Sequence, residues 1–350
     1  MYHCPVRDGL RHKPPIHRRI FFDESERLHL TSFRIKKEFC QSKTDPPLAE
    51  KIFIKTHSIM TILELIHTAA KKLSSEGITN PKTSSEILLS RVLNTHRLNL
   101  YIDYDQSVSL ENEKLFWKLI HRRAQHEPLQ YILGETEFMS LPFMVNPSVL
   151  IPRPETELLA ETVISYCKTL PAGVSPRIID VGTGSGNIAV SAACYIPNAS
   201  VIGLDCSEKA LTTAHINAQD NEVSHKTTFM LCNILSDNIT DNVDLTSADA
   251  VVSNPPYILP QEYPLLPREV REFEPAEALE ARGDDGLEFY TVIMKLAHRW
   301  LKEGGMIAFE VSPSVGSSVV DIVDKAGFRN IQLKQDYAHL DRIVTGIRKS

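Results

Sequence analysis

A glycine-rich loop in the middle of the chain has the spacing of a cofactor-binding turn. The stretch Asp180-Val181-Gly182-Thr183-Gly184-Ser185-Gly186 joins two apolar runs, and its glycines follow the pattern GxGxG. Glycine permits a tight turn and lets the backbone touch a ligand that would collide with a Cβ atom. Backbone N–H groups at the start of the following helix would face a carboxylate. The dinucleotide fingerprint places its third glycine at 187, which is Asn187 here. We therefore expect residues 182–186 to contact a cofactor.

Three further candidate residues follow later strand-like runs. Asp205 lies 23 positions after Gly182, where a carboxylate accepts hydrogen bonds from both ribose hydroxyls of a bound nucleoside. NAD and S-adenosylmethionine share this contact, so Asp205 alone does not choose between them. Asn233 and Ile234 follow the third strand-like run, where such folds contact adenine, and Ile234 indicates apolar packing against the ring.

The tetrapeptide Asn254-Pro255-Pro256-Tyr257 indicates which chemical group the enzyme would modify. It follows the apolar run Ala250–Ser253, at the edge where α/β sheets bind ligands. An amide or aromatic amine nitrogen is a poor nucleophile because its lone pair is delocalised, so an enzyme that methylates it must hold both N–H groups on acceptors. The Asn254 side-chain oxygen and the Pro255 carbonyl supply two acceptors, the prolines stiffen the loop, and the Tyr257 ring offers a stacking face. The motif predicts methylation of a planar NH2 nitrogen without a strong general base.

The spacing of apolar runs predicts an α/β fold from about residue 154 onward. Strand-like and helix-like runs alternate, which calls for a parallel sheet with helices on both faces. The expected strands are 177–181, 201–204, 228–231, 250–253 and 306–311, and the expected helices are 188–195, 208–218, 287–301 and 315–325.

The first part of the chain divides into three segments. Residues 1–59 contain paired prolines and no sustained period, and we interpret them as a poorly ordered extension, arising from an over-called start or serving as a targeting segment. Residues 60–127 are predicted to form a small helical domain, with Thr83 or Ser84 as the N-cap of one helix. Residues 128–153 are predicted to be a linker built around a hairpin.

Composition narrows the class of partner. The net charge is −6, and residues 1–59 carry 12 Lys and Arg against 7 Asp and Glu, which leaves −11 on residues 60–350. That balance argues against a nucleic-acid partner. No apolar run reaches membrane-spanning length, none of the 13 histidines lies in a metal-binding motif, and the spacing of the 6 cysteines favours a reducing compartment. We expect a cytoplasmic monomer without a metal, with the mitochondrial matrix as the alternative compartment.

Residues 60–350 resemble the HemK/PrmC family of protein-(glutamine-N5) methyltransferases. The resemblance rests on the glycine loop and on the stretches 127–134, 150–157, 254–258, 273–275 with 278–279, 284–287 and 341–344. It implies a seven-stranded Rossmann-like methyltransferase sheet over 154–350 and an N-terminal helical domain that helps to hold the substrate. It also implies S-adenosylmethionine as cofactor, bound by Gly182, Gly184, Gly186, Asp205, Ile234 and Asn254. The substrate implied is the Gly-Gly-Gln motif of peptide chain release factors, whose glutamine would meet residues 254–257.

Two local features leave questions open. The family usually has a Gly-Gln pair where this chain has Glu310-Val311-Ser312-Pro313-Ser314-Val315, and we interpret that edge as lying outside the residues that carry chemistry. Residues 151–157 suit a helix start, with pocket lining by Arg153 or Glu155 as the alternative. Rival functions are methylation of a ribosomal protein glutamine, methylation of adenine N6 in nucleic acid, and binding without turnover.

Overall fold

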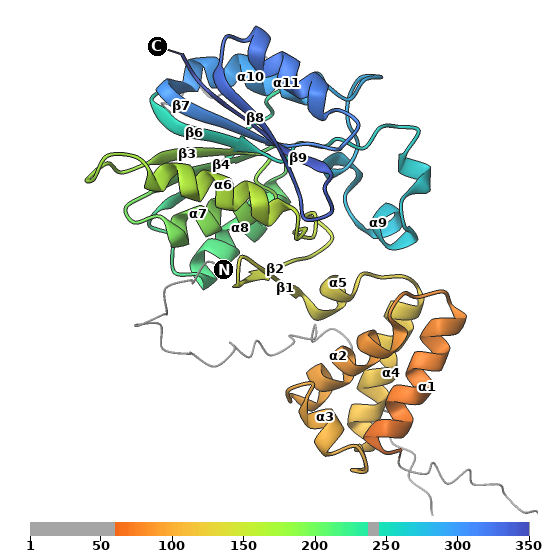
Figure 1. The fold of residues 1–350 in the computed structure, drawn as a ribbon. Coiled ribbons are helices and arrows are strands. Elements are labelled where there is room, and N and C mark those ends of the chain that lie inside the picture. The colour runs from red at the N-terminus through yellow and green to blue at the C-terminus, as the bar shows by residue number, and fades with distance from the viewer. Residues whose placement is uncertain (1–59, 237–244, 350) are drawn as a thin grey trace, which may run out of the picture. The chain divides into compact units, whose positions relative to one another are not determined.

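A mixed seven-stranded sheet forms the centre of the C-terminal part in the computed structural model, which describes residues 60–236 and 245–349 (Figure 1). The strands are β3 (Arg177–Val181), β4 (Ser200–Asp205), β5 (Thr227–Leu231), β6 (Ala248–Ser253), β7 (Leu301–Glu310), β8 (Arg329–Gln335) and β9 (Asp341–Ile347). Their order is β5-β4-β3-β6-β7-β9-β8. This arrangement confirms the expected Rossmann-like α/β fold.

The five strands expected from the sequence, β3 to β7, run parallel as predicted, but the sheet has a further strand of the opposite direction. β9 runs antiparallel to both of its neighbours, β7 and β8. The reason is the short connection from β8, a turn in which Asp336 accepts backbone hydrogen bonds from Ala338 and Leu340 and pairs with Arg342. A turn this tight joins antiparallel strands, whereas a parallel pair needs a long crossover.

Helices cover both faces of the sheet, because successive strand residues point to opposite sides. Ile178 and Val201 pack on the side of α6 (Thr156–Lys168), α7 (Asn187–Tyr195) and α8 (Glu208–Asp220). Ile179 and Ile202 pack on the side of α10 (Glu288–Trp300) and α11 (Gly316–Lys325). Figure 1 shows the two helical layers on either side of the strands. The predicted helices 188–195, 208–218, 287–301 and 315–325 are confirmed to within two residues at each end.

The N-terminal described part is helical, as predicted. It comprises α1 (Ile62–Ser75), α2 (Pro81–Leu93), α3 (Asn99–Ile102) and α4 (Leu110–Ala124), whose apolar residues share one core. Thr61 caps α1 with a complete capping box to Glu64. The expected N-cap of α2 is wrong, since the helix begins earlier, with Pro81 in the first turn after Asn80.

The predicted linker has two different parts. α5 (Leu129–Leu133) is helical and packs through Leu129, Ile132 and Leu133 on the core of α1 to α4, so the hairpin prediction is wrong there. β1 (Glu135–Phe138) and β2 (Leu141–Met144) form the expected hairpin, in which Phe138 and Phe143 pack edge to face and join the core beside α6 to α8.

An irregular segment connects β6 to α10. It contains η2 (Tyr263–Leu265), α9 (Arg268–Phe273) and η3 (Ala276–Ala278), and Ile258 bridges Glu280 at its base. The interpretation of residues 1–59 as an extension lies outside the described residues. No helix in the described ranges is long and apolar enough to span a bilayer.

Candidate active site

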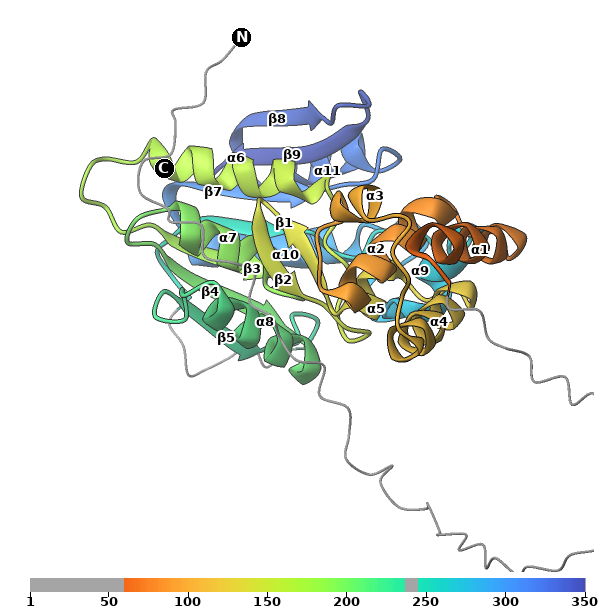
Figure 2. The same ribbon diagram turned by 90° about the horizontal axis from the view of Figure 1, so that it is seen from below.

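Four neighbouring strands end together at one edge of the sheet, and each delivers a polar or glycine residue there. Val181 of β3 pairs with Leu204 of β4 and with Ser253 of β6, and Ser253 pairs with Phe309 of β7. The residues that end these strands or come directly after them are Asp205, Gly182, Asn254 and Glu310. The predicted cofactor loop and the predicted substrate motif therefore begin side by side at the carboxyl edge. Strands β3, β4 and β7 are labelled in Figure 2, and β6 is labelled in Figure 1.

The glycine loop has the backbone that its composition predicts. Gly182, Gly184 and Gly186 have φ of 74°, 56° and 77°, which a residue with a Cβ rarely adopts. A Cβ added at Gly182 would meet no atom within 4 Å, and one at Gly184 would meet only Gly182 O at 4.0 Å. The loop thus keeps one side open to a ligand. Gly182 N and Thr183 N donate to Leu204 O at 2.8 and 2.9 Å, which anchors the other side.

Thr183 and Ser185 turn inward. The Thr183 hydroxyl donates to Asp180 at 2.7 Å, and Asn217 donates to the Ser185 carbonyl at 2.8 Å. Both residues, backbone included, are only 2% exposed. Thr183 and Ser185 therefore offer little surface to a cofactor.

Asp180 is a buried carboxylate behind the loop, and burial raises its pKa to about 7 although Thr183 and the Ala189 N–H donate to it. An unfolded chain ionises this group near its ordinary value of 3.8, so the group destabilises the fold increasingly as pH rises from about 4 to about 7. Between pH 5 and pH 8 the melting temperature of the wild type should fall because of this group. We expect the fall to be smaller in Asp180→Asn, by about a few degrees. Thermal melts of both proteins at the two pH values test this. Equal pH dependence in both proteins would show that Asp180 does not titrate in this window.

Asp205 holds the glycine loop and the start of α8. Its carboxylate accepts from Gly184 N at 2.8 Å and from Ser207 N at 2.9 Å, and burial raises its pKa despite these bonds. Both carboxylate oxygens keep further lone pairs for ribose hydroxyls. Asn233 is exposed, and its side chain accepts a hydrogen bond from Leu235 N. Ile234 is half-buried against the core on the side of α10 and α11. Cys232 N bonds Asp205 O, which places this segment next to Asp205.

The Asn-Pro-Pro-Tyr segment contains two acceptors, on the half-buried Asn254 and the buried Pro255, that no described residue engages. Ser253 donates to Val181 O at 2.7 Å and fixes the end of β6. The Asn254 side-chain nitrogen donates to the Thr156 hydroxyl at 3.3 Å, and Tyr257 donates to Glu310 at 3.2 Å. Within the described residues, neither the Asn254 side-chain oxygen nor the Pro255 carbonyl accepts a hydrogen bond. These are the two oxygens that the sequence nominates for the substrate.

Two residues that the sequence did not nominate lie against this motif. Thr156, at the start of α6, is 2% exposed and donates to Glu310 at 2.7 Å. Glu310, at the end of β7, is 1% exposed, and burial raises its pKa despite Thr156, Arg342 and Tyr257. Burial and the nearby Glu310 charge in turn raise the pKa of Tyr257. The edge at Glu310, which the sequence analysis placed apart from the residues that carry chemistry, thus lies against the predicted substrate motif through its contact with Tyr257.

The segment 151–157 meets the segment 273–275. The buried Glu274 accepts from Arg153 at 2.6 Å and from Ile151 N at 3.1 Å. This pair ties the connection before α6 to the irregular segment after the substrate motif. Arg153 therefore contributes an ion pair that holds both segments in place near the edge.

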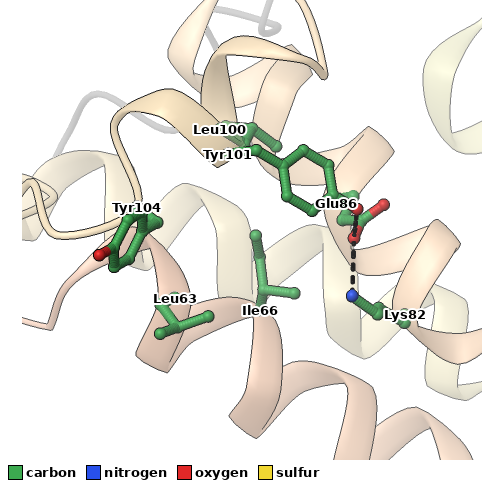
Figure 3. Close-up of a pocket in the computed structure, with 7 residues that line it drawn as sticks. All are labelled: Leu63, Ile66, Lys82, Glu86, Leu100, Tyr101 and Tyr104. Carbon is green, nitrogen blue, oxygen red and sulfur yellow. Dashed lines mark hydrogen bonds and ion pairs between the residues drawn. The ribbon is translucent and has the colours of Figure 1, made fainter.

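A separate hollow lies among the helices of the N-terminal part. It is lined by Leu63, Ile66, Lys82, Glu86, Leu100, Tyr101 and Tyr104 (Figure 3). Burial would raise the pKa of Glu86, but hydrogen bonds from Tyr101 and Arg97 outweigh it and hold the pKa below its ordinary value. The carboxylate is thus already satisfied, and the hollow offers mainly an apolar and aromatic surface.

Two families match the chain. Residues 64–134 match the PrmC N-terminal domain, and residues 156–266 match the methyltransferase small domain. The first match covers α1 to α5, and the second covers the glycine loop, Asp205 and the Asn-Pro-Pro-Tyr motif.

The edge fits S-adenosylmethionine, the cofactor of this methyltransferase fold. The glycine loop keeps an open side with N–H groups at the start of α7, which suits a carboxylate. Asp205 retains acceptor capacity that suits ribose hydroxyls, and Ile234 is an apolar residue at the position predicted to meet the adenine. The contacts of individual residues with the cofactor remain predictions.

Similar proteins share most of the chain. A release factor glutamine methyltransferase of Chlorobaculum tepidum is 38% identical over 286 residues, which cover 81% of this chain and 96% of the relative. Proteins of the same description from Flavobacterium psychrophilum and Moorella thermoacetica are 40% and 37% identical, and the alignments cover 74% and 83% of this chain and 88% and 99% of those relatives. At this identity and coverage, the chain belongs to the release factor glutamine methyltransferase family.

Proposed function

We propose that this chain transfers the methyl group of S-adenosylmethionine to the side-chain amide nitrogen of the glutamine in the Gly-Gly-Gln motif of peptide chain release factors. One observation carries the proposal. The Asn254 side-chain oxygen and the Pro255 carbonyl accept no hydrogen bond from the described residues, and they follow β6, which pairs with the strand that leads into the glycine loop. The names of the relatives support a release factor over a ribosomal protein or a nucleic acid.

The residues at the edge would act by holding and orienting the amide. S-adenosylmethionine, when bound, supplies an electrophilic methyl group on a positively charged sulfur. Asn254 and Pro255 would each accept one N–H of the glutamine amide, which supports tetrahedral character at the nitrogen and aims its lone pair at the methyl group. The half-buried Tyr257 ring would stack on the flat amide. The nitrogen becomes acidic once alkylated, so no strong base is needed to remove its proton.

The helical part would bind the body of the release factor. Large apolar side chains are exposed there, and these are Leu63, Leu98, Tyr101, Ile102, Tyr104 and Leu110. Leu63, Tyr101 and Tyr104 also line the hollow among these helices, and exposed apolar surface of this kind favours contact with another protein. We propose residues 60–127 as this substrate-binding domain, 128–153 as the linker and 154–350 as the catalytic domain of a monomer. The substrate would place the enzyme in the cytoplasm or the mitochondrial matrix, where peptide release takes place.

Labelled methyl transfer tests the proposal. We expect the purified chain, given methyl-labelled cofactor and a release factor, to modify one residue, the glutamine of the Gly-Gly-Gln motif, as mapped by mass spectrometry. A factor with that glutamine changed to alanine is expected to stay unlabelled. A short Gly-Gly-Gln peptide should react with a kcat/KM at least tenfold lower than the intact factor, because it lacks the surface for the helical domain. Label on a ribosomal protein or on nucleic acid, with none on the factor, would refute the proposed substrate.

A further inference from the structure

We infer that Thr156 and Glu310 fix the direction of the Asn254 side-chain amide and so act as positioning residues for methyl transfer. The inference rests on the proposed function, since it assigns the Asn254 oxygen to the substrate. An asparagine amide has a donor end and an acceptor end of nearly the same shape. Only one of its two orientations offers oxygen to an incoming N–H group.

The directions of the hydrogen bonds determine which orientation is present. The Thr156 hydroxyl donates its single proton to a Glu310 carboxylate oxygen at 2.7 Å. The Thr156 oxygen then has only lone pairs left for Asn254. The atom of Asn254 that faces it, at 3.3 Å, must therefore be the nitrogen. The Asn254 oxygen points the other way and stays available as an acceptor.

Glu310 also orients Tyr257 of the motif through a hydrogen bond. Its other carboxylate oxygen accepts from the Tyr257 hydroxyl at 3.2 Å. One buried carboxylate thus holds both the amide acceptor and the aromatic ring. The Tyr290 hydroxyl donates to the Glu310 backbone carbonyl. The charges nearest the Glu310 carboxylate are those of Arg342 and Glu155. Burying a carboxylate is costly, and the arrangement uses that group to direct two hydroxyl donors.

Three variants separate this role from packing. Thr156→Val keeps the side-chain shape but removes the hydroxyl, and Thr156→Ser restores the hydroxyl. Thr162→Val makes the same change at another buried threonine of α6, whose hydroxyl contacts only Lys334 at 3.5 Å among the described residues. We expect Thr156→Val to lower kcat on the release factor about tenfold or more, with KM and cofactor Kd changed less than about threefold. Thr156→Ser should recover most of kcat, and Thr162→Val should match the wild type.

A measurement without turnover makes the inference independent of the substrate. The side-chain NH2 signals of Asn254 can be identified in an NMR spectrum of the holoenzyme as the pair lost in Asn254→Asp. We expect this pair to shift in Thr156→Val and in Glu310→Gln, and to stay in place in Thr162→Val. If wild-type protein fails to methylate a release factor while these shifts occur, the proposed substrate is wrong and the positioning role stands. Unmoved Asn254 signals in Thr156→Val, or a wild-type kcat in that variant, would overturn the inference.

Discussion

Asn254→Ala is expected to lower kcat for methyl transfer roughly 100- to 1000-fold, which is the usual cost of removing one preorganised polar group at a reacting centre. The variant removes the side-chain acceptor that would hold one N–H of the glutamine amide and leaves only the Pro255 carbonyl. The amide would then rotate, and its lone pair would lose alignment with the methyl group. The measurement is single-turnover transfer of labelled methyl to a saturating concentration of release factor.

Cofactor binding provides the internal control for this variant. The resemblance also assigns Asn254 to the cofactor, but the glycine loop after β3 and Asp205 at the end of β4 are expected to hold the cofactor's carboxylate and ribose, and this variant leaves them unchanged. Calorimetric titration should therefore give a cofactor Kd within about threefold of the wild-type value, and a melting curve should show a folded protein. Wild-type turnover in Asn254→Ala would remove the motif from the mechanism. An equally large loss of cofactor affinity would assign Asn254 mainly to the cofactor.

Asp205→Ala is expected to weaken cofactor binding by roughly 1.5–3 kcal/mol, since the ribose hydroxyls lose a charged acceptor. The structure adds a second cause, because Asp205 also accepts from Gly184 N and Ser207 N and so shapes the glycine loop. The expected rise in Kd is about 10- to 150-fold, measured by calorimetry.

Asp205→Asn separates these two causes. Asparagine keeps one side-chain oxygen for the Gly184 N–H but loses the charge, so its Kd should lie between those of the wild type and Asp205→Ala. At saturating cofactor, both variants should keep kcat near the wild-type value. An unchanged Kd in Asp205→Ala would mean that the ribose lies elsewhere and that the predicted strand register does not mark the cofactor site.

The parts of the fold with local signals could be predicted from sequence. β3 to β6 are short apolar runs, and the glycine spacing marks the turn after β3. β8 and β9 gave no such signal, because β8 lies at the edge with mostly exposed or half-buried residues and β9 reverses direction after a short turn. The helix α5 could not be predicted because its 5 residues between Pro128 and Gly134 are too few to show a helical period.

The positioning network could not be predicted because its members are far apart in sequence. Thr156 and Glu310 are separated by 154 positions, and Asn254 lies 98 positions after Thr156. No local pattern marks a threonine at the start of a helix or a glutamate at the end of a strand as neighbours of an asparagine motif. The Gly-Gln pair typical of the family is missing after Glu310, so that strand end carries no family motif. Residue-level contacts with the cofactor at Asn233 and Ile234 stay predictions.

A crystal structure of the chain with S-adenosylhomocysteine and a peptide containing Gly-Gly-Gln tests the orienting role of Asn254 and Pro255 most directly. The account predicts that the glutamine amide nitrogen lies within about 3.2 Å of both the Asn254 side-chain oxygen and the Pro255 carbonyl, facing the cofactor sulfur. A glutamine bound elsewhere, or held with its amide oxygen toward these two acceptors, would contradict it.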